Sequence, residues 1–267
     1  MFIRAENKNI MLRVMLLTLM VLPLNACSYT QNKNKIMDAS GIEISDPYEN
    51  LNRKVTSFNT SVDNIFVNPT IRGYRAIAPK PARQGIRNFL RNLRTPINLA
   101  NQLLQGNLEG AGKTTVRGII NTSLGLGGFI DVAGHEGIEY ELEDFGQTLA
   151  VWGVPHGPYF VVPFIGPSSM RDYTGFFVDS VSDPVGWALT SNDQYALSIG
   201  KFGMDYLDVR ESFYDILQDQ QSTSIDYYAA LRSIYYQNRR AMVHNNNPSA
   251  QQNDLPEIPD FDYEEDF

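Results

Sequence analysis

The sequence holds one cysteine and three histidines, and so has few of the residues that most often build cross-links and metal sites. With a single cysteine no intrachain disulfide can form, and the fold must be held by burial of side chains or by a partner. The histidines, His135, His156 and His244, are isolated, with no H-E-x-x-H pattern and no second thiol. We therefore expect no metal site and no cofactor.

The start of the chain lacks an apolar run long enough to cross a membrane. Residues 14–24 are an apolar run of about 11 residues, whereas a spanning helix needs about 20. Three basic residues precede this run, which ends in Leu24-Asn25-Ala26-Cys27. This order is typical of a bacterial lipoprotein signal peptide. We predict that residues 1–26 are the signal peptide and that Cys27 is the site of lipid attachment; the alternative is a plain signal peptide with a chance cysteine at its end.

Lipid attachment at Cys27 would keep the mature protein on a membrane surface. Two or more acyl chains hold a protein on a bilayer almost permanently. Ser28 follows the cysteine, whereas an aspartate there often signals retention at the inner membrane. By analogy with known lipoproteins, we predict a lipid-anchored protein of the outer membrane.

Beyond the anchor, composition divides the chain into three parts. Residues 27–45 are polar and without period, which predicts a flexible tether. Residues 46–243 carry the periodic apolar positions of a folded domain. Residues 244–267 hold a run of unopposed acids without an apolar face, which predicts a disordered acidic tail.

Apolar spacing within the folded part predicts helices. The expected helices cover residues 81–93, 97–105 and 110–121, then a stretch from a capping box at 191–194 to about 217, and another from a capping box at 223–226 to about 244. Residues 149–165 are almost wholly apolar but contain three prolines and two glycines, so they cannot form a continuous helix. We expect an irregular segment there that the fold or lipid must cover.

Complete catalytic motifs are missing. Residues 110–115 resemble a phosphate-binding loop, but Asn107 stands where its first glycine belongs and a helix is expected where a strand should precede it. Residues 125–128 lack the full spacing of a dinucleotide fingerprint, and residues 168–169 lack the closing glycine of a nucleophile elbow. Glu143 and Asp144 are adjacent and would diverge by about 100° on a helix. We therefore predict that the protein is not an enzyme.

Acidic residues are missing between Asn64 and Leu108, where seven basic residues occur, and six acids without a base then lie within residues 131–144. Four arginines lie beside the apolar face of the helix expected over residues 81–93: Arg83, Arg87, Arg91 and Arg94. We predict that they face phospholipid head groups; the alternative is a solvated helix face. With a formal net charge of −8, the chain is not expected to bind nucleic acid.

One set of motifs resembles a known family. It begins with Asp46-Pro47-Tyr48-Glu49-Asn50-Leu51-Asn52-Arg53 and continues, in order, to Asp183-Pro184. Between them lie Gly125-Leu126-Gly127-Gly128-Phe129-Ile130-Asp131-Val132-Ala133 and Glu143-Asp144-Phe145-Gly146-Gln147-Thr148-Leu149. Over about residues 46–190 the chain resembles the MlaA (VacJ) family of outer-membrane lipoproteins.

The resemblance implies an all-α fold, a ring of amphipathic helices lying in the inner leaflet of the outer membrane, on its periplasmic side. It implies a polar path through the ring, binding to an outer-membrane porin trimer, and retrograde transport of phospholipid to a periplasmic carrier similar to MlaC. The candidate channel or hinge residues are Asn59, Gly125, Gly127, Gly128, Asp131 and Asp144. A polar path would remove much of the free energy that a head group needs to shed water and cross hydrocarbon.

Two alternatives stay open at this point. A structural lipoprotein that only braces a porin would show the same sequence features. An envelope hydrolase is a weaker alternative, because within residues 46–243 only the pair Glu143-Asp144 offers adjacent carboxylates.

Overall fold

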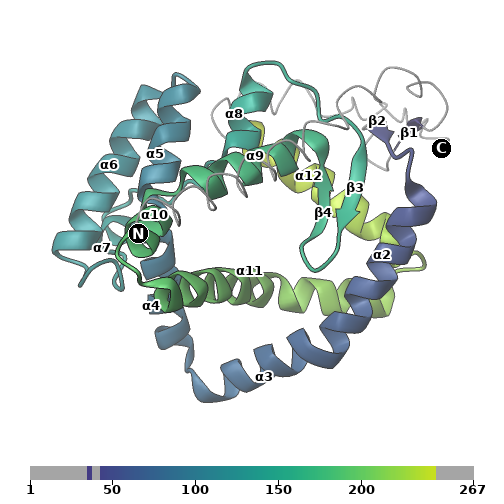
Figure 1. The fold of residues 1–267 in the computed structure, drawn as a ribbon, viewed down its shortest axis with the longest axis horizontal. Helices are drawn as coiled ribbons and strands as arrows, with labels where there is room; N and C mark the ends of the chain where they lie inside the picture. Colours follow the sequence, from purple (N-terminus) through teal and green to yellow (C-terminus); the bar gives the residue numbers. More distant parts are fainter. Residues whose placement is uncertain (1–34, 38–42, 245–267) are drawn as a thin grey trace, which may run out of the picture.

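The computed structural model describes residues 35–37 and 43–244, whose helices are arranged around a ring (Figure 1). The predicted signal peptide, Cys27 and the predicted acidic tail after His244 lie outside the described residues. The all-helical ring fold is confirmed.

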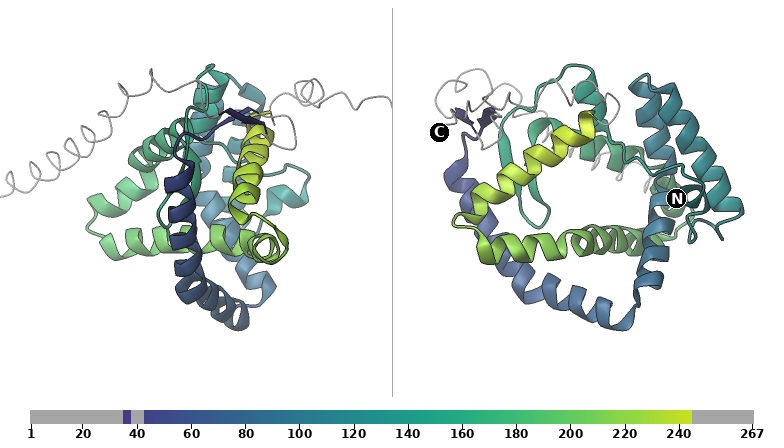
Figure 2. Two further views of the ribbon diagram at one scale, coloured as in Figure 1. Left: turned by 90° about the vertical axis from the view of Figure 1, so that its right-hand side faces the viewer. Right: turned by 180° about the vertical axis from the view of Figure 1, so that it is seen from behind.

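The helices are α2 (Glu49–Val62), the π-helical turn η2 (Asp63–Val67), α3 (Asn68–Ile77), α4 (Lys80–Leu93), α5 (Thr95–Leu104), α6 (Leu108–Ser123), α7 (Val132–His135), α8 (Phe145–Val151), α9 (Met170–Ser182), α10 (Pro184–Ser191), α11 (Tyr195–Thr223) and α12 (Tyr227–His244). From α2 to α8 the elements follow the rim of the ring in chain order, and α9 and α10 then return toward α4 (Figure 1). In Figure 1, α11 runs across the ring from the side of α4 to the side of α2. From behind, α12 closes the ring between α2 and α8 (Figure 2).

Two short antiparallel hairpins accompany the helices. Strands β1 (Lys35–Met37) and β2 (Glu43–Ser45) pair with Ile36 opposite Ile44, and Ile44 is buried. The prediction of an unstructured tether over residues 27–45 is therefore wrong for these two strands. The polar composition of this segment did not indicate that Ile44 pairs with Ile36 and packs in the apolar core.

The second hairpin lies in the proline-rich apolar segment. Strands β3 (Tyr159–Val162) and β4 (Gly166–Ser169) pair with Val162 opposite Gly166, and alternate β3 residues are buried. The prediction that residues 149–165 form no continuous helix is confirmed. The prediction that this segment is irregular is wrong for residues 159–162, which form β3. The prolines fall before β3 and in its turn, where no ladder hydrogen bond is lost.

The three helices expected in the basic half are confirmed with shifts of a few residues at their ends. Helices α4, α5 and α6 occupy the expected ranges. Asn107 begins α6, and its side-chain oxygen accepts a hydrogen bond of 2.9 Å from the Gly110 amide. Gly110 and Gly112 therefore lie inside α6. This agrees with the prediction that residues 110–115 do not form a phosphate-binding loop.

The two expected capping boxes are wrong, because both mark helix ends. Ser191 is the last residue of α10, and Thr223 is the last residue of α11. At the first site, Asp193 has a left-handed φ of 57° and the Gln194 amide donates to the Leu189 carbonyl at 2.8 Å. This hydrogen bond closes the carboxyl end of a helix in the manner of a Schellman motif.

The interior of the described chain is more polar than apolar. Ten buried residues are hydrophobic, whereas twenty buried residues are polar or charged. The apolar core is one small cluster of Ile44, Tyr159, Val161, Tyr228 and Tyr236. Meanwhile 32 large hydrophobic side chains are exposed, among them Leu126 at 73%, Ile199 at 72% and Phe202 at 67%. This distribution is the reverse of that in an ordinary soluble domain.

Within the described ranges, every helix is too short or too polar to cross a membrane.

Candidate functional site

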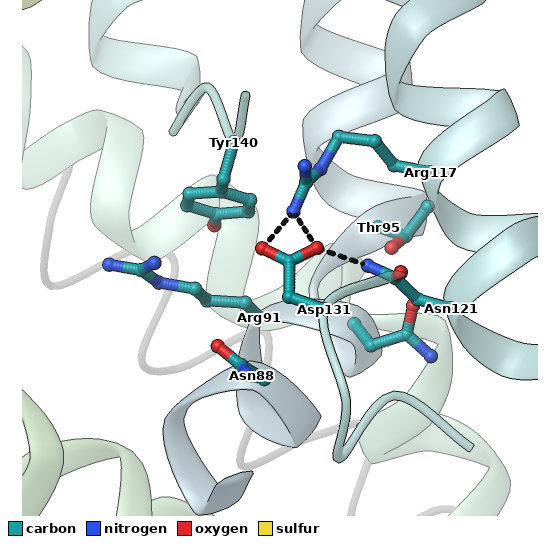
Figure 3. Close-up of a pocket in the computed structure, with 8 residues that line it drawn as sticks. Asn88, Arg91, Thr95, Arg117, Asn121, Asp131 and Tyr140 are labelled. Carbon is teal, nitrogen blue, oxygen red and sulfur yellow. Dashed lines mark hydrogen bonds and ion pairs between the residues drawn. The ribbon is translucent and has the colours of Figure 1, made fainter. Parts of the chain in front are cut away.

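A small polar pocket lies where α4, α5 and α6 meet the segment around α7 (Figure 3). We call it the corner pocket; it is lined by Asn88, Arg91, Asn92, Thr95, Arg117, Asn121, Asp131 and Tyr140. Its volume of about 10 Å³ is room for one water molecule. Of the predicted site residues, the pocket brings together Arg91 and Asp131, with the glycines of residues 125–128 packed against its wall.

Asp131 is the acceptor at the centre of the corner pocket. Its two carboxylate oxygens accept hydrogen bonds from Arg117 at 2.8 and 2.9 Å, and one of them also accepts from the Asn121 side-chain amide at 2.9 Å (Figure 3). The same oxygen caps α7 by accepting from the Gly134 amide at 2.9 Å. Burial alone would raise the pKa of Asp131, but these hydrogen bonds and the charge of Arg117 hold it below its usual value. The carboxylate is thus ionised and fully engaged.

Tyr140 supplies an aromatic wall to the pocket. The guanidinium carbon of Arg91 lies 4.7 Å from the centre of its ring, and that of Arg117 lies 5.7 Å from it. Its hydroxyl oxygen accepts a hydrogen bond of 3.1 Å from the Asn98 side-chain amide. One ring therefore orders two cations, which it attracts through its π face.

The glycine turn, residues 124–130, packs against α4 beside the pocket. Gly127 and Gly128 have left-handed φ values of 72° and 104°, which glycine adopts without strain. Asn92 donates a hydrogen bond of 3.1 Å to the Gly127 carbonyl, and a Cβ atom on Gly128 would lie 2.5 Å from Cβ of Asn92. The turn thus needs glycine for both conformation and space, while its role as a hinge stays a prediction.

Asn59 lies far from the corner pocket, on α2. Its side-chain amide donates to the Val162 carbonyl at 3.0 Å, and its side-chain oxygen accepts from the Phe164 amide at 2.8 Å. Asn52, two turns earlier, makes the same pair of bonds to Tyr159 and Val161, at 3.2 and 3.0 Å. These two asparagines fasten the β3–β4 hairpin to α2.

Asp144 belongs to a separate buried cluster that joins α12 to α8 and α9. Arg239 of α12 donates to Asp144 at 2.6 and 3.0 Å and to Asp172 at 2.9 and 3.1 Å. Burial would raise the pKa of each aspartate, but the Arg239 guanidinium holds the pKa of both below the usual value. Arg171 and the Tyr235 hydroxyl also donate to Asp172. We call Arg239, Asp144, Asp172, Arg171 and Tyr235 the Arg239 cluster.

Glu143 and Asp144 do not converge, but the reason differs from the one expected. The pair is not helical: Asp144 has an extended backbone and caps α8 by accepting from the Gln147 amide at 2.9 Å. Glu143 accepts hydrogen bonds from Gln102 and Gln105, at 3.2 and 2.8 Å. Neighbouring side chains of an extended segment point to opposite sides, so the two carboxylates serve different partners.

The arginines of α4 lie against acids of α11. Arg87 is 2.7 Å from Glu211 and 2.9 Å from Asp208, and Arg83 is 3.6 Å from Glu211. The prediction that Arg83 and Arg87 face the membrane is therefore wrong. The acids of α11 recur every three or four residues and so present one charged face to the arginines.

The other two arginines of the predicted set have different surroundings. Arg91 borders the corner pocket, and Arg94 is 43% exposed, with its guanidinium 3.8 Å from Asp179. Contact of these two with head groups stays a prediction.

Several site residues were missed by sequence reasoning, chiefly Arg117, Tyr140, Glu211 and Arg239. A helical spacing of acids over residues 208–215 was a usable signal for Glu211, because it matches the spacing of the arginines before residue 95. No local pattern pointed to Arg117 or Arg239. Arg117 pairs with Asp131, which lies 14 residues away, and the partners of Arg239 lie 67 and 95 residues away in sequence.

Comparisons with known proteins agree with this fold. A family model described as MlaA lipoprotein matches residues 44–242. The intermembrane phospholipid transport system lipoprotein MlaA of Escherichia coli strain K12 is 35% identical over 226 residues, 80% of this chain and 88% of that protein. Its counterpart in Haemophilus influenzae is 29% identical over 247 residues, 90% and 96% of the two chains.

A solved structure is also similar. Described as "Structural basis for maintenance of bacterial outer membrane lipid asymmetry", it superposes with a TM-score of 0.65 at 33% identity, covering 74% of this chain and 99% of the other. This chain belongs to the MlaA lipoprotein family.

Proposed function

We propose that this protein removes misplaced phospholipids from the outer leaflet of the outer membrane and passes them to a periplasmic carrier, which maintains the lipid asymmetry of that membrane. The names of its relatives concern phospholipid transport between membranes. The single observation that carries the proposal is the reversed distribution of side chains, with polar groups buried and large apolar groups exposed.

The reversed distribution suits a ring immersed in lipid. Exposed apolar side chains on η2 and α11, such as Phe66, Ile199 and Phe202, would be covered by acyl chains of the inner leaflet. Ion pairs and amides inside the ring offer hydrogen bonds to a head group, which would otherwise lose its hydration in hydrocarbon at a cost of several kcal/mol. Such a device needs no catalytic residue.

The anchor and partners complete the proposal. Lipid attached at Cys27 would keep the ring on the periplasmic side of the outer membrane. An outer-membrane porin trimer would hold the ring in place, and a carrier similar to MlaC would accept the lipid in the periplasm.

The proposal can be tested in cells that lack their own family member. Expression of the full-length chain should lower the amount of phospholipid on the cell surface, measured by labelling intact cells with a reagent that cannot enter them. A pull-down of the porin from the same cells reports binding separately. Unchanged surface phospholipid at normal protein level and porin binding would refute transport and favour a porin-bracing lipoprotein. New lipid cleavage products in those cells would instead favour a hydrolase.

A further inference from the structure

Helix α11 has an apolar face opposite the acids that contact α3 and α4. Asp208, Glu211 and Asp215 pair with arginines of those helices on one side. At 100° per residue, five residues of the other side fall within an arc of about 80° that holds no charged residue: Ile199, Phe202, Tyr206, Val209 and Phe213. All of these except Tyr206 are exposed. The residues that the structure describes therefore leave this face without an apolar cover.

The tip of the β3–β4 hairpin lies on this face of α11. The Tyr206 hydroxyl donates a hydrogen bond of 3.0 Å to the Phe164 carbonyl. The ring of Phe164 packs edge-to-face against Phe58 of α2, with the ring centres 5.3 Å apart. Phe58, Phe164, Ile165 and Val209 are each 46–56% exposed, and Val209 is one helical turn from Tyr206. These five residues form an apolar surface that joins α11 to α2 across the turn, and we call it the hairpin-tip surface.

Side chains of the neighbouring helices bind the polar backbone atoms of this turn. Asn59 of α2 donates to the Val162 carbonyl at 3.0 Å and accepts from the Phe164 amide at 2.8 Å. Tyr206 of α11 binds the Phe164 carbonyl, and Pro163 has no N–H to satisfy. In water an exposed turn needs no such partners, because water supplies them. In hydrocarbon the partners are required, since a backbone group left without one is strongly destabilising there.

The hairpin lies inside the ring. Figure 1 shows its tip at α11, within the outline of the outer helices, and the view from behind in Figure 2 shows the same. Residues 159–169 include no charged residue. Along α11 the apolar face continues from Val209 to Phe202 and Ile199, which in the proposed function contact acyl chains of the inner leaflet. An acyl chain could therefore pass from the leaflet to the turn without leaving an apolar surface.

We propose that the hairpin-tip surface binds an acyl chain of the phospholipid that passes through the ring. The acyl chain lies against Phe164 and Val209. It belongs to the transported lipid, and not to the bulk leaflet, because the turn lies inside the ring. The inference rests on the proposed function, which supplies the phospholipid.

The first test asks whether phospholipid reaches the turn. The full-length chain carries the photo-crosslinking residue p-benzoylphenylalanine at position 164, in cells that lack their own family member and whose phospholipids are radiolabelled. Irradiation should attach labelled phospholipid to the protein. The yield should exceed severalfold that of the same residue at Gln237, an exposed polar position on α12. Equal yields at the two positions would overturn the hairpin-tip surface.

The second test asks whether this phospholipid is the transported one. Phe164→Asn removes the ring at a φ of 65°, which asparagine tolerates, and surface phospholipid should rise toward the level of cells without the protein. Val209→Thr keeps the shape of its side chain and adds a hydroxyl, and it should raise surface phospholipid less. Ile77→Asn is the matched control, because it removes an apolar side chain that is 86% exposed on α3, and it should behave as the wild type does.

Protein level and porin pull-down are measured for every variant. An adduct at position 164, together with normal surface phospholipid in both Phe164→Asn and Val209→Thr, would mean that only bulk lipid meets the turn. That result would overturn the assignment to the transported lipid.

Failure of this inference and failure of the proposed function give different results. If wild-type protein lowers surface phospholipid but position 164 gives no more adduct than position 237, transport stands and the hairpin-tip surface is overturned. If wild-type protein does not lower surface phospholipid, the proposed function falls, and the transported lipid falls with it as the source of the acyl chain.

Discussion

Replacement of Arg239 by methionine should strongly destabilise the ring. Arg239 is buried and makes four hydrogen bonds to two aspartates that belong to other helices. Methionine has similar length and fills the space, but it leaves the carboxylates without this cation. Asp172 keeps Arg171 at 2.9 Å, whereas Asp144 keeps the cap of α8, a long bond to the Gln147 side chain and the more distant charge of Arg94.

The size of the effect follows from the burial of Asp144. Removal of one partner from a buried ion pair generally destabilises a protein by about 3–5 kcal/mol, because a buried charge is left uncompensated. Since Asp172 retains a second arginine, we expect a loss near the lower end, about 3 kcal/mol in the free energy of unfolding. That loss is a large part of the total stability of a typical domain, which is about 5–15 kcal/mol.

The loss should depend on pH. Arg239 holds the pKa of Asp144 and Asp172 below the unfolded value, so the stability they contribute is present above about pH 4 and is lost as pH falls through the folded pKa values. In Arg239→Met, burial raises the pKa of Asp144 instead, and the variant loses stability as pH rises above about 4. The difference between the two proteins should therefore be largest at pH 7 and small near pH 3.

The assay is chemical unfolding of both proteins in detergent, followed by circular dichroism at several pH values. Lys113→Met serves as the matched control, because Lys113 pairs only with Glu109 on the exposed face of α6, and it should unfold like the wild type. A loss below about 1 kcal/mol in Arg239→Met, or one equal at pH 7 and pH 3, would refute the buried-charge reasoning.

Three further predictions concern the anchor, the turn and the hairpin. Cys27→Ala should abolish acyl labelling of the protein and leave it unprocessed or mislocalised; labelling that persists contradicts the lipoprotein assignment. Gly128→Val should impair control of surface phospholipid at equal protein level, because its Cβ would collide with Asn92 in a left-handed conformation, and normal surface phospholipid would count against a role for the turn. Asn59→Leu should remove the hydrogen bonds that Asn59 makes to the Phe164 amide and to the Val162 carbonyl, which we expect to increase hydrogen exchange across the β3–β4 turn. Unchanged exchange would argue that Asn59 does not fasten the hairpin to α2.

Sequence reasoning succeeded where the signal is local or covers many residues. The arginine helix, residues 81–93, was predicted because apolar and basic residues alternate with helical period. The ring was predicted because a long ordered set of motifs resembles one family, and this prediction rested on the resemblance and not on periodicity. Left-handed φ values at Gly127 and Gly128 agree with the general use of glycine in such turns.

Sequence reasoning failed where the partner is distant. Arg87 was expected to face lipid, because an unpaired basic stripe beside an apolar face suits a membrane surface. Its partner Asp208 lies 121 residues away, and one sequence does not say which of several acidic segments reaches it. The capping boxes failed for a local reason: a short polar residue before an acid or amide also occurs in the turn that ends a helix, as at Ser191.

The polar interior bears on how such a ring keeps its shape. In a soluble domain the hydrophobic effect drives helices together, but helices whose apolar faces meet acyl chains gain little by burying those faces against each other. The contacts between distant parts of this ring are accordingly directional: Arg239 joins α12 to α8 and α9, Glu211 joins α11 to α3 and α4, and Asn59 joins the hairpin to α2. Because each contact fixes an angle and a register, such directional contacts can hold the helices of the ring in place where the apolar core is small.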